Sequence, residues 1–143
     1  MRKSLVLVTA LLFQACASLP ENFPQEPGYS WPNPESTQLG AFFANYVPAE
    51  GPGTGVRLVA DPRDAFKARY AFASLAERTL DLQYYLWKGD LTGRLLLWRA
   101  LEAADRGVKV RILMDDIYHA GRDRVYAVID HHPNLEMRVF NPM

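Results

Sequence analysis

Three polar segments in the second half of the chain each follow a run rich in alternating apolar residues. Lys88 and Asp90 come after the first run, Asp115 and Asp116 after the second, and Asn141 after the third. In a parallel sheet these segments would meet at one edge, because ligands of open α/β sheets bind beyond the carboxyl ends of the strands. The sequence therefore makes Asp90, Asp115 and Asp116 candidates for a pocket or for its immediate support.

Each of these carboxylates also has a structural interpretation. The adjacent pair Asp115-Asp116 could bind Mg²⁺, which is commonly held by one or two carboxylates. The pair could equally accept hydrogen bonds from loop amides or pair with Arg122 and Arg124, and we favour this structural role. Asp90 stands where a helical pattern begins, which favours a helix cap over a catalytic acid. We expect no metal and no cofactor.

The three histidines do not form a recognisable catalytic or metal site. His119 falls in an expected loop, and His131-His132 ends an expected helix. Nothing in the sequence pairs them with a serine or cysteine nucleophile, and adjacent histidines without a nearby cysteine lack the spacing of a zinc site. We therefore interpret all three as surface or capping residues.

The elements that position these residues alternate between strand and helix. Strands are expected at 56–60, 79–87, 108–114 and 135–140, and helices at 62–76, 91–106 and 122–131. Asp61-Pro62 provides an N-cap and first-turn proline, and Gly107 provides a left-handed helix end. Crossovers of this length connect parallel strands, and such units are right-handed. The expected fold class is α/β, with a mainly parallel sheet flanked by helices.

The expected strand 79–87 is predicted to divide its side chains between two faces. Period-two alternation places Leu80, Leu82, Tyr84 and Leu86 on one face, and Asp81, Gln83, Tyr85 and Trp87 on the other. One face is expected to be core, while the other could line a cleft.

The first 55 residues differ in character from the rest. A positive start, Met1–Lys3, precedes an apolar run, Leu5–Phe13, that is too short to span a bilayer. Cys16 follows, so residues 1–15 resemble a bacterial lipoprotein signal peptide; the alternative is an ordinary signal peptide with an incidental cysteine. Residues 16–55 are rich in proline and glycine and are predicted to form a tether. Leu39–Val47 interrupts it as an expected helical turn packed on the domain.

Lipidation at Cys16 would anchor the protein in a membrane. Ala17, rather than aspartate, follows the cysteine, which in lipoproteins of this type implies sorting to the bacterial outer membrane, facing the periplasm. The 16 basic and 16 acidic side chains cancel, so no basic field favours nucleic acid as a partner.

Five stretches together resemble phospholipase D-like proteins, especially bacterial cardiolipin synthases of the lipoprotein-associated type. The resemblance spans about residues 38–143 and implies that residues 56–143 form the first half of such a domain. The stretches are Ala76–Trp87, Thr92–Leu96, Ala103–Val110, Leu113–Asp116 and Val139–Pro142.

The resemblance implies metal-free covalent catalysis through two His-x-Lys-x4-Asp motifs. One histidine attacks phosphorus, the other protonates the leaving alcohol, and the lysines hold phosphate oxygens. The first motif would lie downstream of Phe140–Pro142. None of the four lysines here has a histidine two residues before it, because those positions hold Met1, Ala65, Leu86 and Gly107. No catalytic residue of the family is therefore assigned to this chain.

The expected function is that of a truncated phospholipase D-like phosphatidyltransferase, with a phospholipid substrate in the full-length family and no activity in this portion alone. A portion of a phosphodiesterase or nuclease of the same family is one alternative. A non-enzymatic exported lipoprotein that binds a partner or a lipid is another. An exposed sheet edge would also favour self-association.

Overall fold

The computed structural model describes residues 27–46, 55–118 and 123–142. The expected signal peptide, Cys16, His119 and Arg122 lie outside these residues. The chain divides into two compact units, residues 1–30 and 31–143, and every described helix and strand belongs to the second. Within the described ranges, no helix is long and apolar enough to cross a bilayer.

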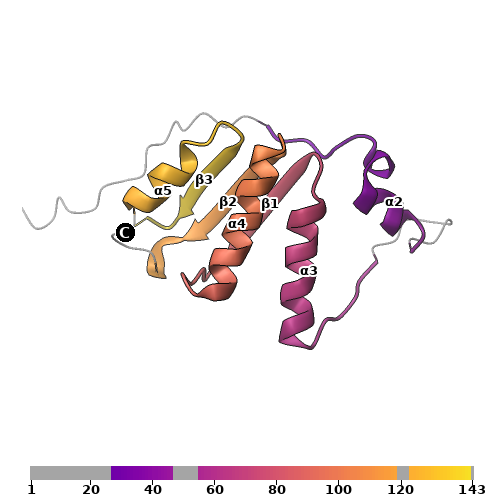
Figure 1. The fold of residues 1–143 in the computed structure, drawn as a ribbon, viewed down its shortest axis with the longest axis horizontal. Helices are drawn as coiled ribbons and strands as arrows, with labels where there is room; N and C mark the ends of the chain where they lie inside the picture. Colours follow the sequence, from indigo (N-terminus) through magenta and orange to yellow (C-terminus); the bar gives the residue numbers. More distant parts are fainter. Residues whose placement is uncertain (1–26, 47–54, 119–122, 143) are drawn as a thin grey trace, which may run out of the picture. The chain divides into compact units, whose positions relative to one another are not determined.

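A three-stranded parallel sheet forms the centre of residues 31–143. Strands β1 (Thr79–Tyr84), β2 (Lys109–Asp115) and β3 (Leu135–Phe140) lie in the order β1-β2-β3. Val110 of β2 is in register with Leu80 of β1 and with Leu135 of β3. Helices α4 (Leu91–Asp105) and α5 (Asp123–Asp130) make the two crossovers (Figure 1). The expected α/β class, with a parallel sheet and flanking helices, is confirmed.

The core lies between the sheet and the small residues of α4. Ala100, Ala103 and Ala104 are fully buried, which lets α4 approach the central strand closely. Helix α3 (Pro62–Leu75) packs along α4 and contributes buried Ala73. Burial of apolar surface is the main force that holds such layers together. The other buried apolar residues are Ala76, Leu80, Leu96, Val108, Val110, Ile112, Met114 and Leu135.

The helix ends follow the sequence expectations. The Asp61 carboxylate accepts hydrogen bonds from the backbone N–H groups of Arg63 and Asp64, and Pro62 is the first residue of α3. Gly107 has φ +89°, a left-handed conformation that L side chains rarely adopt. The expected helical turn is confirmed as a short helix, α2 (Gln38–Ala44). A 3₁₀ turn, η1 (Pro34–Ser36), precedes it.

Helix α2 packs on the domain, as expected. The ring of Phe43 lies 6.0 Å from that of Phe72 on α3. The backbone N–H of Gln38 donates to the Glu77 carboxylate at 3.4 Å. These contacts tie the segment that precedes the sheet to the outer side of α3.

Two of the expected strands are different in the structure. Residues 56–60 form no strand, and Val56 and Leu58 are about nine-tenths exposed. The two β-branched residues of this segment, Val56 and Val59, suit a strand. No neighbour among the described residues, however, supplies the hydrogen bonds that a strand requires. Strand β1 ends at Tyr84 rather than at residue 87, because Tyr84 pairs with Met114 and its partner strand β2 ends one residue later, at Asp115.

Arg106 joins two helices at the edge of the sheet where the strands begin. Its Nη2 atom lies 3.0–3.3 Å from the carbonyl oxygens of Ala73, Ser74 and Ala76, at the end of α3. The last carbonyls of a helix have no partner within it. A guanidinium that donates to three of them both satisfies these groups and fixes α3 against α4.

We predict that Arg106→Ala lowers the free energy of unfolding by about 1.5–3 kcal/mol, the range for hydrogen bonds that involve a charged group. Chemical denaturation of the full chain measures the change. Arg63→Ala, which removes an exposed arginine from the first turn of α3, is the matched control and should change the value by less than about 0.5 kcal/mol. Equal effects of the two substitutions would contradict the role assigned to Arg106.

Candidate functional site

Asp115 and Asn141 lie at the carboxyl ends of β2 and β3, the edge of the sheet where the sequence predicted them, and the structure adds a contact between them. The Asp115 Oδ1 atom accepts a hydrogen bond from the Ile117 backbone N–H at 3.0 Å. Its Oδ2 atom lies 3.5 Å from the Asn141 amide nitrogen. Asn141 itself has φ +49°, a left-handed conformation in which asparagine is one of the better-tolerated residues. Asp115 therefore both starts the turn after β2 and supports the end of β3.

The neighbouring carboxylates are in different environments. Asp116 opens the 3₁₀ turn η2 (Asp116–Tyr118) and is only 7% exposed, whereas Asp115 is half-buried at the surface. A buried carboxylate needs polar partners, since its desolvation is costly. Within the described residues no three His, Cys, Asp or Glu side chains gather into a group that could hold a metal ion. The geometry of Asp115 thus fits the structural interpretation of the pair.

A hollow of about 260 Å³ lies beside Asp115, between the ends of the strands. The side chains that line it include Gln83, Tyr85, Leu113 and Phe140. Tyr85 and Phe140 are both more than half exposed. This hollow therefore combines aromatic surface with one carboxylate at the edge where ligands of parallel sheets bind.

Charged pairs lie on β1, β2 and β3, on the same face of the sheet as the side chains of Gln83 and Leu113. Arg111 donates from Nε and Nη2 to the two carboxylate oxygens of Asp81, at 2.5 and 2.7 Å. This hydrogen bonding with Asp81 is the main cause that raises the pKa of the Arg111 guanidinium. On β3, Arg138 pairs with Glu136 at 2.6 Å. Because β1 and β2 are parallel neighbours, the bidentate Arg111–Asp81 pair reinforces their register.

Asp90 is the N-cap of α4, as favoured from the sequence. Its Oδ1 atom accepts hydrogen bonds from the Gly93 backbone N–H at 2.9 Å and from the Thr92 hydroxyl at 2.7 Å. The Gly93 bond, and then the Thr92 bond, lower the pKa of the Asp90 carboxyl. An acid that stays ionised and is engaged by its own helix suits a cap rather than a proton donor.

Trp87 lies on the helix-covered side of the sheet, so its predicted placement opposite Tyr84 is wrong. The two rings are 4.8 Å apart in an edge-to-face arrangement. The Trp87 indole N–H donates to the Gly93 carbonyl oxygen at 3.2 Å. Strand alternation fails here because β1 has already ended at Tyr84. The Gly89-Asp90 turn signal after Lys88 could have indicated this early end.

Gly93 permits the close approach of this loop to α4. A Cβ atom at position 93 would lie 1.9 Å from the Lys88 carbonyl oxygen and 3.1 Å from the Trp87 indole nitrogen. The first distance is far inside van der Waals contact and involves backbone, which cannot rotate away. Glycine at this position is therefore what lets the β1–α4 loop fold over the first turn of the helix.

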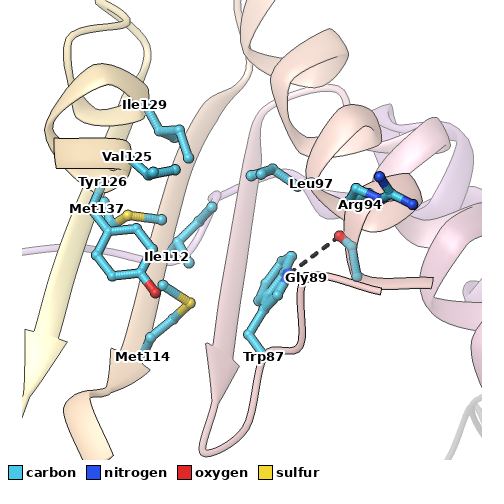
Figure 2. A pocket seen from close by; sticks show the side chains of 11 residues that line it. Trp87, Gly89, Arg94, Leu97, Ile112, Met114, Val125, Tyr126, Ile129 and Met137 are labelled. Carbon is cyan, nitrogen blue, oxygen red and sulfur yellow. Dashed lines mark hydrogen bonds between the residues drawn. The ribbon is translucent and has the colours of Figure 1, made fainter. Parts of the chain in front are cut away.

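A cavity that sequence reasoning missed opens beside Trp87. Its volume is about 350 Å³, and it lies between α4, α5 and the sheet (Figure 2). No sequence pattern marks it, because each apolar position looks like ordinary core in its own element. The residues that line it are Trp87, Gly89, Gly93, Arg94, Leu97, Ile112, Met114, Val125, Tyr126, Ile129 and Met137.

His132 lies at the opposite edge of the sheet, where the strands begin. Its Nε2 atom is 3.2 Å from an Asp105 carboxylate oxygen at the end of α4. Its Nδ1 atom accepts a hydrogen bond from the Asn134 backbone N–H, also at 3.2 Å. A strand of six residues rises roughly 20 Å, so His132 is about that far from the carboxyl ends. His132 therefore connects the end of α4 to the loop before β3, and its two ring nitrogens are engaged in these contacts.

The chain matches parts of several known proteins, although no protein-family model matches it. It is 53% identical to Cardiolipin synthase C of Escherichia coli (strain K12) over 79 residues, which is 55% of this chain and 17% of that protein. An uncharacterized protein of Helicobacter pylori (strain J99) is 31% identical over 146 aligned residues, 99% of this chain and 28% of its own length. The Major cardiolipin synthase ClsA of Bacillus subtilis (strain 168) is 37% identical over 62 residues, covering 43% and 13%. The chain thus spans less than a third of each relative.

We predict that Gly93→Ala destabilises the chain by about 1–3 kcal/mol, because the new methyl group overpacks the Lys88 carbonyl. Thermal unfolding followed by tryptophan fluorescence measures the effect, and Trp87 should report a changed environment. Gly55→Ala is the matched control, since a Cβ at position 55 meets no atom within 4 Å. A Gly93→Ala variant as stable as Gly55→Ala would disprove the close approach.

Proposed function

We propose that this chain is the amino-terminal portion of a phospholipid phosphatidyltransferase. The proposal starts from its partial homology to cardiolipin synthases, which supports a phospholipase D-like relationship. The observation that carries the proposal is the 53% identity to Cardiolipin synthase C. A parallel sheet with a polar carboxyl edge is the fold expected of such a portion. The substrate class proposed is the phosphodiester of a phospholipid.

In this proposal the chain supplies scaffold, and the reacting histidines and lysines come from the rest of the enzyme. The 143 residues contain no His-x-Lys pair, and His132 is engaged with Asp105 at the wrong end of the sheet. Asp115, through Asn141, holds the end of β3. Because the first family motif is expected downstream of Asn141, this support would set the direction in which the chain enters the reaction site.

We further propose that Cys16 is lipidated after removal of residues 1–15 and that the mature protein is anchored in the outer membrane. The support is the sequence alone: a basic start, a short apolar run and a cysteine where cleavage belongs. A lipid anchor would keep the scaffold at the surface where phospholipid substrates are found. Stable anchoring requires more than one acyl chain.

A non-enzymatic lipoprotein that binds a partner or a lipid is the second candidate. The lipoprotein-like start of the chain favours it, because an exported lipid anchor suits a binding protein as well as an enzyme. The genomic reading frame beyond codon 143 separates the two candidates. Two downstream His-x-Lys-x4-Asp motifs in frame would support the enzyme, whereas a stop codon with no such frame would support the binding protein.

We predict that the 143-residue chain alone does not convert phosphatidylglycerol to cardiolipin. A chimera in which the matched 79 residues of this chain replace their counterparts in Cardiolipin synthase C should form cardiolipin, because the two segments are homologous. Asp115→Ala in the chimera should reduce the rate by about tenfold to a hundredfold, since a small misplacement of reacting groups is costly. Asp64→Ala, which removes an exposed carboxylate from α3, should leave it unchanged. Lipid extraction and chromatography measure the product.

An inactive but folded chimera would contradict the proposed transferase role. Turnover by purified 143-residue chain would also contradict it if the activity disappeared on substitution of His131 or His132. Circular dichroism of the same preparations separates loss of activity from loss of fold.

For localisation, we predict that Cys16→Ser blocks both processing and acylation in a bacterial host. Ala17→Asp should leave acylation intact and move the protein from the outer to the inner membrane. Ser18→Ala is the neutral control. Fractionation with labelled palmitate measures each outcome, and a Cys16→Ser protein that is still processed and membrane-bound would refute the lipidation.

A further inference from the structure

The cavity between α4, α5 and the sheet reaches the carboxyl edge on the helix-covered face. Ile112 and Met137 form its floor at mid-sheet, and Leu97 and Ile129 extend into it from α4 and α5 (Figure 2). Gly89 and Gly93 lie toward the other end, at the β1–α4 loop. The cavity therefore runs from the core to the edge where the strands end.

Water is a poor occupant of this space. A buried water requires two to four polar partners, and cavities with apolar walls stay dry. The walls are chiefly aliphatic and thioether side chains. The Trp87 indole N–H, one of the few donors among them, already donates to the Gly93 carbonyl. The lining therefore favours an apolar occupant.

The size and lining suit a flexible hydrocarbon chain. A volume of about 350 Å³ lies at the lower end of the range for small-molecule sites, which are mostly apolar with few polar groups. Met114 and Met137 are flexible and polarisable, and methionine adapts its shape to apolar ligands. An adaptable apolar site of this volume suits one flexible hydrocarbon chain.

The end of the cavity at the β1–α4 loop is positively charged. The stem of Arg94 lines the cavity while its guanidinium points outward (Figure 2). No hydrogen bond or ion pair ties this guanidinium to the described part of the chain. Lys88 precedes the same loop, and the ionised Asp90 that caps α4 offsets one of these two positive charges, so that the three groups together keep a net positive charge. An exposed cation beside an apolar cavity complements a molecule with a hydrocarbon tail and an anionic head.

We infer that this cavity binds one hydrocarbon chain of an anionic amphiphile, with the headgroup beside Arg94 at the carboxyl edge of the sheet. The inference rests on the proposed function only for naming a phospholipid as one source of the chain; a free fatty acid is the other. Bound in this way, a phospholipid would have its phosphodiester at the end of the sheet where chemistry is expected.

The test is calorimetric titration of the full chain with three probes that share a twelve-carbon chain, each kept below its micelle concentration. The probes are lauroyl lysophosphatidylglycerol, dodecanoate and uncharged dodecanol. We expect both anionic probes to bind more tightly than dodecanol. Tighter binding of the lysophospholipid identifies a phospholipid source, and equal binding identifies any anionic amphiphile, including fatty acid. Equal binding of all three probes would overturn the role of Arg94.

Substitutions locate the binding. Leu97→Trp fills the cavity and should weaken binding by about tenfold or more, whereas Leu95→Trp, on the exposed side of α4, should not. Met137→Phe fills the same space from β3 if Leu97→Trp fails to fold. Arg94→Gln should weaken only the anionic probes, by about two- to fivefold for an exposed charge, and Arg63→Gln is its control.

Binding that is unchanged in folded cavity-filling variants would overturn the inference. The titration measures binding and not phosphatidyl transfer. A titration that shows no binding would therefore overturn the amphiphile site without contradicting the proposed transferase function, which the chimera assay tests. An inactive chimera together with cavity-dependent binding would reject the transferase and retain the amphiphile site.

Discussion

The close packing of α4 on β2 is the contact on which the rest of the structure depends. Ala100 and Ala103 present almost no side-chain bulk, so the helix lies near Val110 and Ile112 of the central strand. Strand β2 is bonded to both other strands, so anything that displaces it separates the whole sheet. Protein interiors pack at crystal-like density. A larger residue on this face of α4 would therefore overpack the contact and displace the helix from β2.

This packing also gives the sheet its functional polarity. At the edge where strands begin, Arg106 and His132 use their hydrogen bonds to hold helix ends and loops together. At the edge where strands end, Asp115 makes only one short contact and one longer one. At the first edge, the hydrogen bonds of these side chains are thus used to hold the fold together. The second edge retains polar and aromatic surface beside two hollows. That difference is why ligand binding is assigned to the carboxyl edge.

Much of the framework could be predicted because its signals are local. Asp61, Asp90 and Gly107 mark helix ends by their own chemistry, and the spacing between apolar runs determines that the strands are parallel. These features need no knowledge of what packs against them. The placement of Asp115 and Asn141 at one edge of the sheet also follows from local reasoning, since each residue comes at the end of an apolar run and the strands are parallel.

The features that sequence reasoning missed depend on distant partners. Val56–Ala60 has the composition of a strand, yet a strand exists only where a neighbour provides hydrogen bonds. Trp87 turns to the helix side because Gly93 lets the loop close over α4. The alternation of side chains along a strand does not predict such a contact. The cavity arises between three elements, so no single one of them signals it.

We propose that this chain is the scaffold for a histidine-based transfer whose reacting residues belong to the rest of the enzyme. The most direct measurement is to quench the Cardiolipin synthase C chimera during reaction with phosphatidylglycerol and to locate the phosphatidylated histidine by mass spectrometry. We expect the covalent adduct on a histidine contributed by the cardiolipin synthase portion. An adduct on His119, His131 or His132 of this chain would contradict it.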